Sequence, residues 1–157
     1  MIDPDKLMEL AIQKARQGIR FGQSPFGCAV GNDEGVVAVE HNTVLLTTDI
    51  TAHAEVNALR RASKALQRIF LDDCIVATTC EPCPMCMSAL HWARVDTVYY
   101  GATIADASGI GFNELSLPAS ELLRLGNSSV QLAGAVLTEE CRQLFAEWKQ
   151  RPDKQTY

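Results

Sequence analysis

The sequence predicts an α/β protein, a three-layer α/β/α sandwich around a five-stranded mixed sheet. Two observations predict this class. Two apolar segments flank the turn sequence Gly-Asn-Asp-Glu-Gly at 31–35, a pattern typical of a β-hairpin. After them, β-type segments alternate with helical ones, which favours parallel strands with helices on both faces.

Length and composition indicate one folded domain over residues 1–157. An apolar fraction of 47% with 21% charged residues excludes disorder, collagen and coiled coil as the main state. The chain has 14 Lys and Arg against 19 Asp and Glu, a net charge of −5. This acidic balance argues against a broad phosphate-binding surface, so we do not expect a nucleic-acid partner.

The N-terminal sequence and the cysteines indicate the compartment. No apolar run approaches the ~20 residues of a membrane span, and the N-terminus, MIDPDKLMEL, is acidic and helical in pattern rather than a secretory signal. We therefore expect no membrane association and a cytoplasmic location. In a reducing cytosol, the clustering of the six cysteines favours metal or redox chemistry over a disulfide framework.

The N-terminal elements are a helix and a hairpin. Asp3 is the expected N-cap and Pro4 the first helical residue, followed by apolar residues at helical spacing up to Gly18 or Gly22. Residues 26–30 and 36–40 are the predicted hairpin strands, joined by a five-residue loop.

In the middle of the chain, predicted helices and strands alternate. A helix is expected over 52–69 with Thr51 as N-cap, and its arginines and lysine lie outside the apolar stripe, on a face expected to be solvated. A strand over 74–79, a helix beginning at Pro82 and a strand over 97–100 follow.

The C-terminal third contains a long connection, 101–129, with a short helix at 119–125. This helix allows the last strand, 130–133, to be parallel to its predecessor. Thr138 is expected to cap a final helix, and a polar tail over 149–157 ends the chain.

Two motifs suggest a metal site. Residues 51–55 read Thr-Ala-His-Ala-Glu, and residues 80–86 read Cys-Glu-Pro-Cys-Pro-Met-Cys. Cys83 and Cys86 are three apart, on one helical face, and a helix N-terminus favours thiolates. With His53 in the first turn of another helix, they would supply three Zn²⁺ ligands and leave the fourth position open, as in catalytic zinc sites.

Glu55 is the expected proton carrier of this site. It lies two residues past His53 and diverges from it by roughly 200° around a helix, so the two are not expected to bind the same ion. From the first turn its carboxylate can take a proton from a metal-bound water and pass it to a leaving amine.

Other interpretations of these residues exist. Cys83 and Cys86 also resemble a thioredoxin-type redox pair, although that interpretation leaves His53 and Glu55 without a role. A lone His-x-Glu usually marks the start of a surface helix. Cys80 is either buried beside the site or a fourth thiolate, which would make the site structural. The three remaining cysteines are expected in the core: Cys28, Cys74 and Cys141.

The combination of His-Ala-Glu and Pro-Cys-x-x-Cys resembles the zinc-dependent cytidine deaminase superfamily, a signature associated with nucleobase deaminases. The resemblance implies a cytidine deaminase-like fold, zinc bound by His53, Cys83 and Cys86, and Glu55 as proton shuttle. It also implies that the backbone N–H of Ala54 holds a ring carbonyl or nitrogen. A metal-activated water would then displace ammonia from an aminated ring.

Within the superfamily, the chain is most similar to bacterial guanine deaminases. The similarity covers nearly the whole chain, with matching stretches at 25–27, 42, 51–56, 71–74, 80–86, 92–94 and 111–112. It implies that Asn42 binds the purine and that an acidic residue after Gly-Phe assists proton transfer. Here that residue is Glu114, where the family pattern usually has Asp.

The resemblance also implies a homodimer. The C-terminal segment of these enzymes covers the active site of the partner subunit, so we expect residues 149–157 to do so and Tyr157 to reach the partner's zinc pocket. A terminal tyrosine gains from burial, which favours this role over a disordered end.

Three aromatic residues are candidates for the wall of a slot that takes a planar base: Phe26, Trp92 and Phe112. Ordinary core packing is the alternative. We expect the slot for Phe26 and Phe112, while the pattern does not decide between the two for Trp92.

The resulting hypothesis is a zinc hydrolase that converts free guanine, a small-molecule cyclic amidine, to xanthine and ammonia in purine metabolism. The alternatives of the same class are a tRNA adenosine deaminase and a deaminase of guanosine, an amino-triazine or a pterin. The alternative of a different class is a non-catalytic zinc-binding module.

Overall fold

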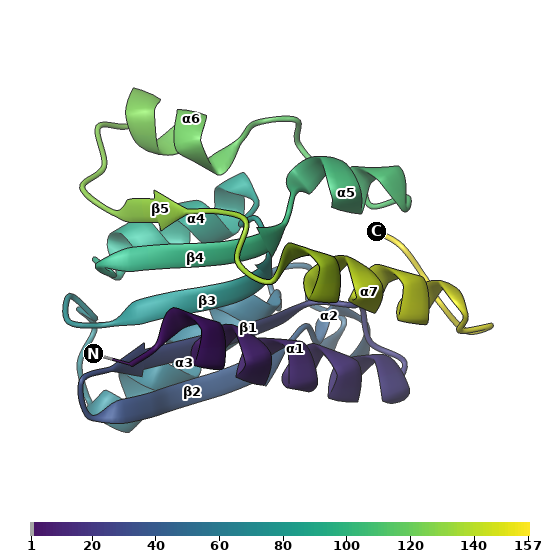
Figure 1. Ribbon diagram of the computed structural model, residues 1–157, viewed down its shortest axis with the longest axis horizontal. Helices are drawn as coiled ribbons and strands as arrows, with labels where there is room; N and C mark the ends of the chain where they lie inside the picture. Colours follow the sequence, from purple (N-terminus) through teal and green to yellow (C-terminus); the bar gives the residue numbers. More distant parts are fainter. Residues whose placement is uncertain (1) are drawn as a thin grey trace.

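The computed structural model describes residues 2–157 and contains a five-stranded sheet in the order β2-β1-β3-β4-β5 (Figure 1). The strands are β1 (Gly27–Asn32), β2 (Gly35–His41), β3 (Ile75–Cys80), β4 (Thr97–Ala102) and β5 (Gln131–Ala133). β1 is antiparallel to β2 and to β3, whereas β3, β4 and β5 are parallel. The predicted mixed sheet, with a hairpin followed by parallel strands, is confirmed.

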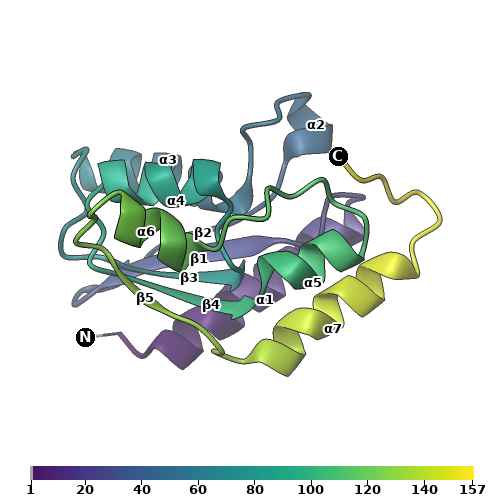
Figure 2. The same cartoon turned by 90° about the horizontal axis from the view of Figure 1, so that it is seen from above.

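Helices cover both faces of the sheet (Figure 2). One face is covered by α1 (Pro4–Arg20), α5 (Ile104–Gly109) and α7 (Thr138–Lys149), and the other by α3 (Ala54–Leu66), α4 (Pro84–Trp92) and α6 (Ala119–Leu125). Each face has its own cluster of buried apolar side chains. This is the three-layer sandwich that the sequence predicts.

The contact between α1 and β1 depends on a glycine. Asp3 caps α1 as predicted, and its Oδ1 accepts the N–H of Asp5. A Cβ at Gly27 would lie 2.1 Å from the carbonyl oxygen of Ala11, closer than any real contact. Only glycine therefore lets the strand lie this close to the helix.

The hairpin turn is tighter than predicted. β1 continues to Asn32 and β2 begins at Gly35, so the loop is shorter than the expected five residues, and a bulge lies between Val30 and Gly31. Asn32 Oδ1 accepts the N–H of Glu34, and Gly35 has a φ of +128°. The side-chain bond and the glycine conformation stabilise this turn.

Three predicted helix starts are wrong. α3 has His53 as N-cap instead of Thr51, whose hydroxyl donates to Asp49. α4 begins at Pro84 after Cys83, not at Pro82. Thr138 lies inside α7 and donates to the carbonyl of Gly101, while Leu137 is the cap.

Two short helices were not predicted. They are α2 (Val44–Thr47) and α5, and α5 begins with a capping box between Thr103 and Asp106. No helix among the described residues combines the length and apolar composition needed to cross a membrane.

Candidate active site

The N-termini of α3 and α4 bring the three predicted metal ligands together. His53 Nδ1 lies 3.7 Å from Cys83 Sγ and 3.5 Å from Cys86 Sγ, and the three ligand atoms lie within 4.8 Å of one another. Tetrahedral zinc, about 2.3 Å from sulfur and about 2.0 Å from nitrogen, would separate such ligands by about 3.6 Å. The donor set and its spacing therefore fit a zinc ion.

Of the three ligands, only Cys83 has its pKa shifted toward the form that binds zinc. The hydrogen bond with Cys86 is the main cause that lowers the pKa of Cys83 to about 4, and His53 adds to it. The same bond, with burial, raises the pKa of Cys86. Burial alone would lower the pKa of His53, but its bond with Cys83 and the nearby Glu55 raise it. A zinc ion would need both thiolates and a neutral imidazole, so binding it would release protons.

Glu55 lies beside the ligands and is held by Thr78. Its side chain is only 6% exposed, and the Thr78 hydroxyl donates to its Oε1 at 3.0 Å. Burial is the main cause that raises the pKa of Glu55, and the charge of Cys83 adds to it. A buried carboxylate with a raised pKa suits proton transfer.

A pocket adjoins the three ligands and collects most of the predicted substrate residues. It is lined by Phe26, Asn42, His53, Glu55, Cys80, Glu81, Cys83, Phe112, Glu114 and Tyr157. Burial, followed by the charge of Cys83, raises the pKa of Glu114 to about 7. The pocket therefore holds a second carboxylate with a perturbed pKa.

Phe26 and Phe112 form an aromatic wall of this pocket. Their ring centroids are 5.0 Å apart in an edge-to-face arrangement, and each ring also contacts an aromatic residue of α7, Phe145 or Trp148. They therefore belong both to the core and to the pocket, which combines the two interpretations.

Tyr157 occupies the mouth of this pocket in its own chain. Asn42 Nδ2 donates to the Tyr157 hydroxyl at 2.6 Å, Asn113 N donates to the main-chain oxygen of Tyr157 at 2.9 Å, and the ring lies 5.8 Å from that of His53. Figure 2 shows the tail running from α7 back toward α2. The volume left in this pocket is about 30 Å³, far below the several hundred Å³ usual for ligand pockets. A purine would therefore enter this pocket only if the tail moved.

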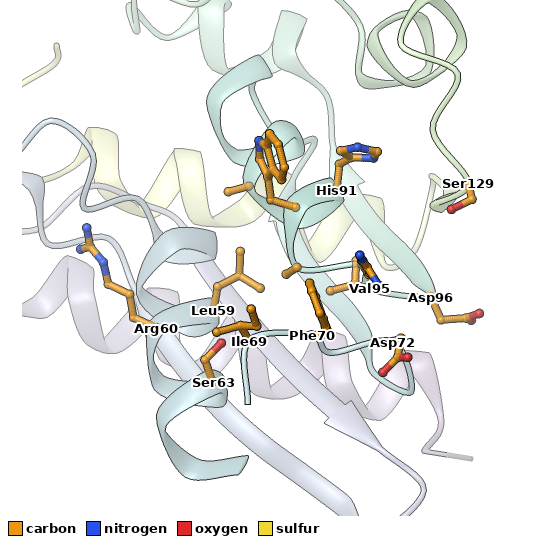
Figure 3. Close-up of a pocket in the computed structure, with 14 residues that line it drawn as sticks. Leu59, Arg60, Ser63, Ile69, Phe70, Asp72, His91, Val95, Asp96 and Ser129 are labelled. Carbon is orange, nitrogen blue, oxygen red and sulfur yellow. The ribbon is translucent and has the colours of Figure 1, made fainter. Parts of the chain in front are cut away.

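Trp92 does not belong to this site. It is 78% exposed at the end of α4 and lines a separate groove of about 1180 Å³ (Figure 3). Within one chain, Trp92 therefore lies outside the pocket, and its exposure excludes the core interpretation. A helical apolar stripe does not show which of its residues a neighbouring element covers.

Two other predicted residues lie close to the ligands. Ala54 is the first residue of α3 and is buried, so the helix itself provides no acceptor for its N–H. Cys80 is buried and its thiol donates to the carbonyl of Thr103. Among the described residues, the ligand group contains His53, Cys83 and Cys86 without Cys80, so Cys80 is not a fourth ligand.

Sequence reasoning missed Thr78 and Glu81. Thr78 is a polar residue in the buried strand β3, and such a residue needs a hydrogen-bond partner, which is the signal that would have found it. Glu81 lies between the cysteines of the predicted motif, and no role is predicted for it from the sequence. Nothing in the local sequence indicates the distant groups that its side chain contacts.

Comparison with known proteins gives a consistent picture. The model of the cytidine and deoxycytidylate deaminase zinc-binding region matches residues 1–102. Guanine deaminase of Bacillus subtilis is 36% identical over 98% of both chains. A tRNA-specific adenosine deaminase of Haemophilus influenzae is 28% identical over 94% of this chain and 83% of its own.

Solved structures agree with this. Guanine deaminase from Nitrosomonas europaea superposes with a TM-score of 0.87 at 25% identity, covering 96% of this chain and 87% of that one. A structure in complex with 2,6-diaminopurine gives a TM-score of 0.88 at 26% identity, over 97% and 84% of the two chains.

Proposed function

The chain belongs to the cytidine and deoxycytidylate deaminase family, and on this premise we propose that it hydrolyses guanine to xanthine and ammonia. The observation that supports this most directly is the full-length similarity to guanine deaminases. The pocket beside the metal-ligand group agrees with it, because Glu55 and Glu114 are among its lining residues and it has an aromatic wall.

The three ligands would hold one zinc ion per chain, and that ion would make a bound water nucleophilic near neutral pH. Glu55 is the proton carrier in this proposal. Its carboxylate takes a proton from the attacking water and delivers it to the amino group that leaves as ammonia. Glu114, with a pKa of about 7, is a second group that can hold or release a proton at neutral pH.

Orientation of the base is assigned to the pocket walls. Phe26 and Phe112 would contact the apolar faces and edges of the ring, and Asn42 would hydrogen-bond its polar edge. The Asn42 amide is already oriented, since its Oδ1 accepts the N–H of Val44 at 3.0 Å. The free N–H of Ala54 would hold a ring carbonyl or nitrogen.

The tail is proposed to act between subunits of a homodimer. An identical segment can make the same contacts on a second copy, so exchange of residues 149–157 costs little. Tyr157 of one subunit would then close the pocket of the other and exclude water from the bound base.

The groove between α3 and α4, lined by the exposed Trp92, is the proposed dimer surface. Leu59, Ile69 and Phe70 lie together in it (Figure 3), and Ile69 is 72% exposed. Its charged lining is balanced: Arg60, Arg94, Asp72 and Asp96. A two-fold interface brings the same patch together from both chains, so such a surface can pair with itself.

Light scattering after gel filtration tests the dimer. Trp92→Arg should shift the chain from dimer to monomer, whereas Phe21→Arg, a change at a residue 69% exposed at the end of α1, should not. A wild-type chain that is monomeric at micromolar concentration would contradict the proposal.

An ammonia-release screen tests the reaction. Free bases, nucleosides, pterins, amino-triazines and tRNA are offered to the zinc-loaded protein, and guanine should be turned over far better than cytosine, cytidine or adenosine in tRNA. Preference for tRNA, with activity that falls steeply as salt rises, would identify a tRNA adenosine deaminase instead. Zinc binding with no turnover of any compound would indicate a binding module.

The six cysteines are all free in the structure, which supports the proposal of a reducing, cytoplasmic environment. The reaction would place the chain in purine metabolism.

A further inference from the structure

Glu81 connects two helix starts that are distant in sequence. Its Oε2 accepts the N–H of Ile104 at 3.0 Å, and its Oε1 accepts the N–H of Ala119 at 2.9 Å. These are the first residues of α5 and α6, where backbone N–H groups have no acceptor within the helix. One carboxylate therefore satisfies an N–H group at both ends of the segment 104–119.

Both N–H donors lie in buried positions and depend on this carboxylate. Ile104 is 6% exposed and Ala119 is 1% exposed, and Pro118, the N-cap of α6, makes no side-chain capping bond. Glu81 itself is fixed, because its backbone N–H donates to the carbonyl of Ala102 at 2.8 Å, extending the pairing of β3 with β4. The side chain thus connects the segment to the carboxyl end of β3, the middle strand of the sheet.

The segment between the two helices supplies one wall of the pocket. After α5 ends at Gly109, the chain has no regular structure until Ala119, and this stretch brings Phe112 and Glu114 to the pocket. Asn113 connects the same wall to the tail, because its N–H donates to the main-chain oxygen of Tyr157 at 2.9 Å. Anchoring at both ends is what fixes an irregular stretch of this kind.

We propose that Glu81 is a positioning residue for the deamination reaction. By anchoring the segment 104–119, it holds Phe112 and Glu114 at the pocket and, through Asn113, also positions Tyr157. This inference rests on the proposed function for its kinetic consequence, although the anchoring itself does not. Glu81 acts through the segment 104–119, so its loss leaves the metal ligands in place. Glutamine at this position keeps one acceptor and puts an amide donor against the second N–H.

Two measurements test the proposal on the full-length, zinc-loaded chain. In hydrogen exchange, Glu81→Gln should speed exchange over 104–119 and in the tail, with exchange in β3 and α4 unchanged and zinc content kept. Glu121→Gln is the matched control, because this partly exposed glutamate in the first turn of α6 pairs with Arg124 on its own helix. Unchanged exchange over 104–119 in Glu81→Gln would overturn the anchoring.

The kinetic test is a double-mutant cycle with Glu114. Displacement of a reacting group by about 1 Å costs about 10²-fold in rate, so Glu81→Gln should lower kcat/KM for guanine by about that factor. In the Glu114→Gln background, the same change should cost far less, because its effect passes largely through Glu114. If the losses in kcat/KM of the two single variants multiply in the double variant, the positioning role is overturned and Glu81 contacts the base directly.

The two proposals can fail separately. If Glu81→Gln does not fold, Glu81→Asp, which keeps the charge on a shorter side chain, should give the same pattern of faster exchange over 104–119. If the wild-type chain does not deaminate guanine, the proposed function fails, while the exchange measurement still decides whether Glu81 anchors the segment.

Discussion

The side chain of Asn42 donates a 2.6 Å hydrogen bond to the hydroxyl of Tyr157, which is 115 residues further along the chain. Both residues are assigned to the base by family resemblance, and in this structure they bind each other. The contact occupies one of the two N–H groups of the amide. Under the proposed function, a base that bonds to Asn42 would break or share this contact, so the tail would be part of the binding equilibrium.

Deletion of residues 153–157 should lower kcat/KM for guanine strongly and leave zinc content unchanged. The reason is loss of the ring and hydroxyl that close the pocket, which lets water reach the bound base. Steady-state kinetics with metal analysis checks this. The exposed tail residue Lys154 offers a control, because Lys154→Ala should behave like the wild-type chain. A truncated chain with full efficiency would mean that the tail has no catalytic role.

Replacement of Cys83 or Cys86 by serine should abolish stoichiometric zinc binding. A serine hydroxyl cannot replace a thiolate ligand near neutral pH. Cys80→Ser is the matched control, since Cys80 lies in the same pocket but outside the ligand group and should keep one zinc per chain. Metal analysis of the three purified variants decides, and full retention by both ligand variants would refute the site.

Glu55→Gln should keep zinc and fold and lose about 10²–10⁴-fold in kcat, because the amide cannot carry the proton. The measurement is single-turnover ammonia release, with circular dichroism and zinc content to show that the rest of the site is intact. A rate close to that of the wild-type chain would mean that another group moves the proton.

Thr78→Val should lower kcat by about ten- to hundredfold through Glu55. The change removes the hydroxyl that donates to Glu55 Oε1 at 3.0 Å while keeping the shape of the side chain, and a hydrogen bond to a charged group contributes about 1.5–3 kcal/mol. Thr78→Ser retains the hydroxyl and should recover most of the rate. Equal losses in the two variants would assign the effect to packing instead.

Asp106 should make stability depend on pH below about pH 5. Burial alone would raise its pKa, but the N–H of Thr103 and the guanidinium of Arg142 lower it below 3.8. With a folded-state pKa below the unfolded one, its stabilising contribution is complete above the unfolded pKa and is lost as pH falls through the folded one. The Tm difference between the wild-type chain and Asp106→Asn should be positive and constant from about pH 5 to pH 8 and shrink toward pH 3. A Tm difference that does not change with pH would show that the charge of the Asp106 carboxylate does not stabilise the fold.

Local chemistry determined much of the molecule from sequence alone. Asp3 and Pro4 start α1 because capping and a fixed φ act within a few residues. The alternation of strands and helices predicted the mixed sheet, because strands joined through helices are favoured to lie parallel. His53, Cys83 and Cys86 could be identified because their residue types and their places at helix starts already match zinc chemistry.

Only the tertiary structure decided how distant segments meet. Trp92 has the spacing of a core residue, yet it is exposed, because periodicity shows that residues share a face and not whether that face is covered. A polar residue in a buried strand, such as Thr78, indicates that a partner exists, but the partners of Thr78 and Glu81 lie 23 to 38 residues away and only the fold brings them together. Tyr157 is placed by Asn42 and Asn113, since a tail without regular structure takes its position from the surfaces it contacts and not from its own residues.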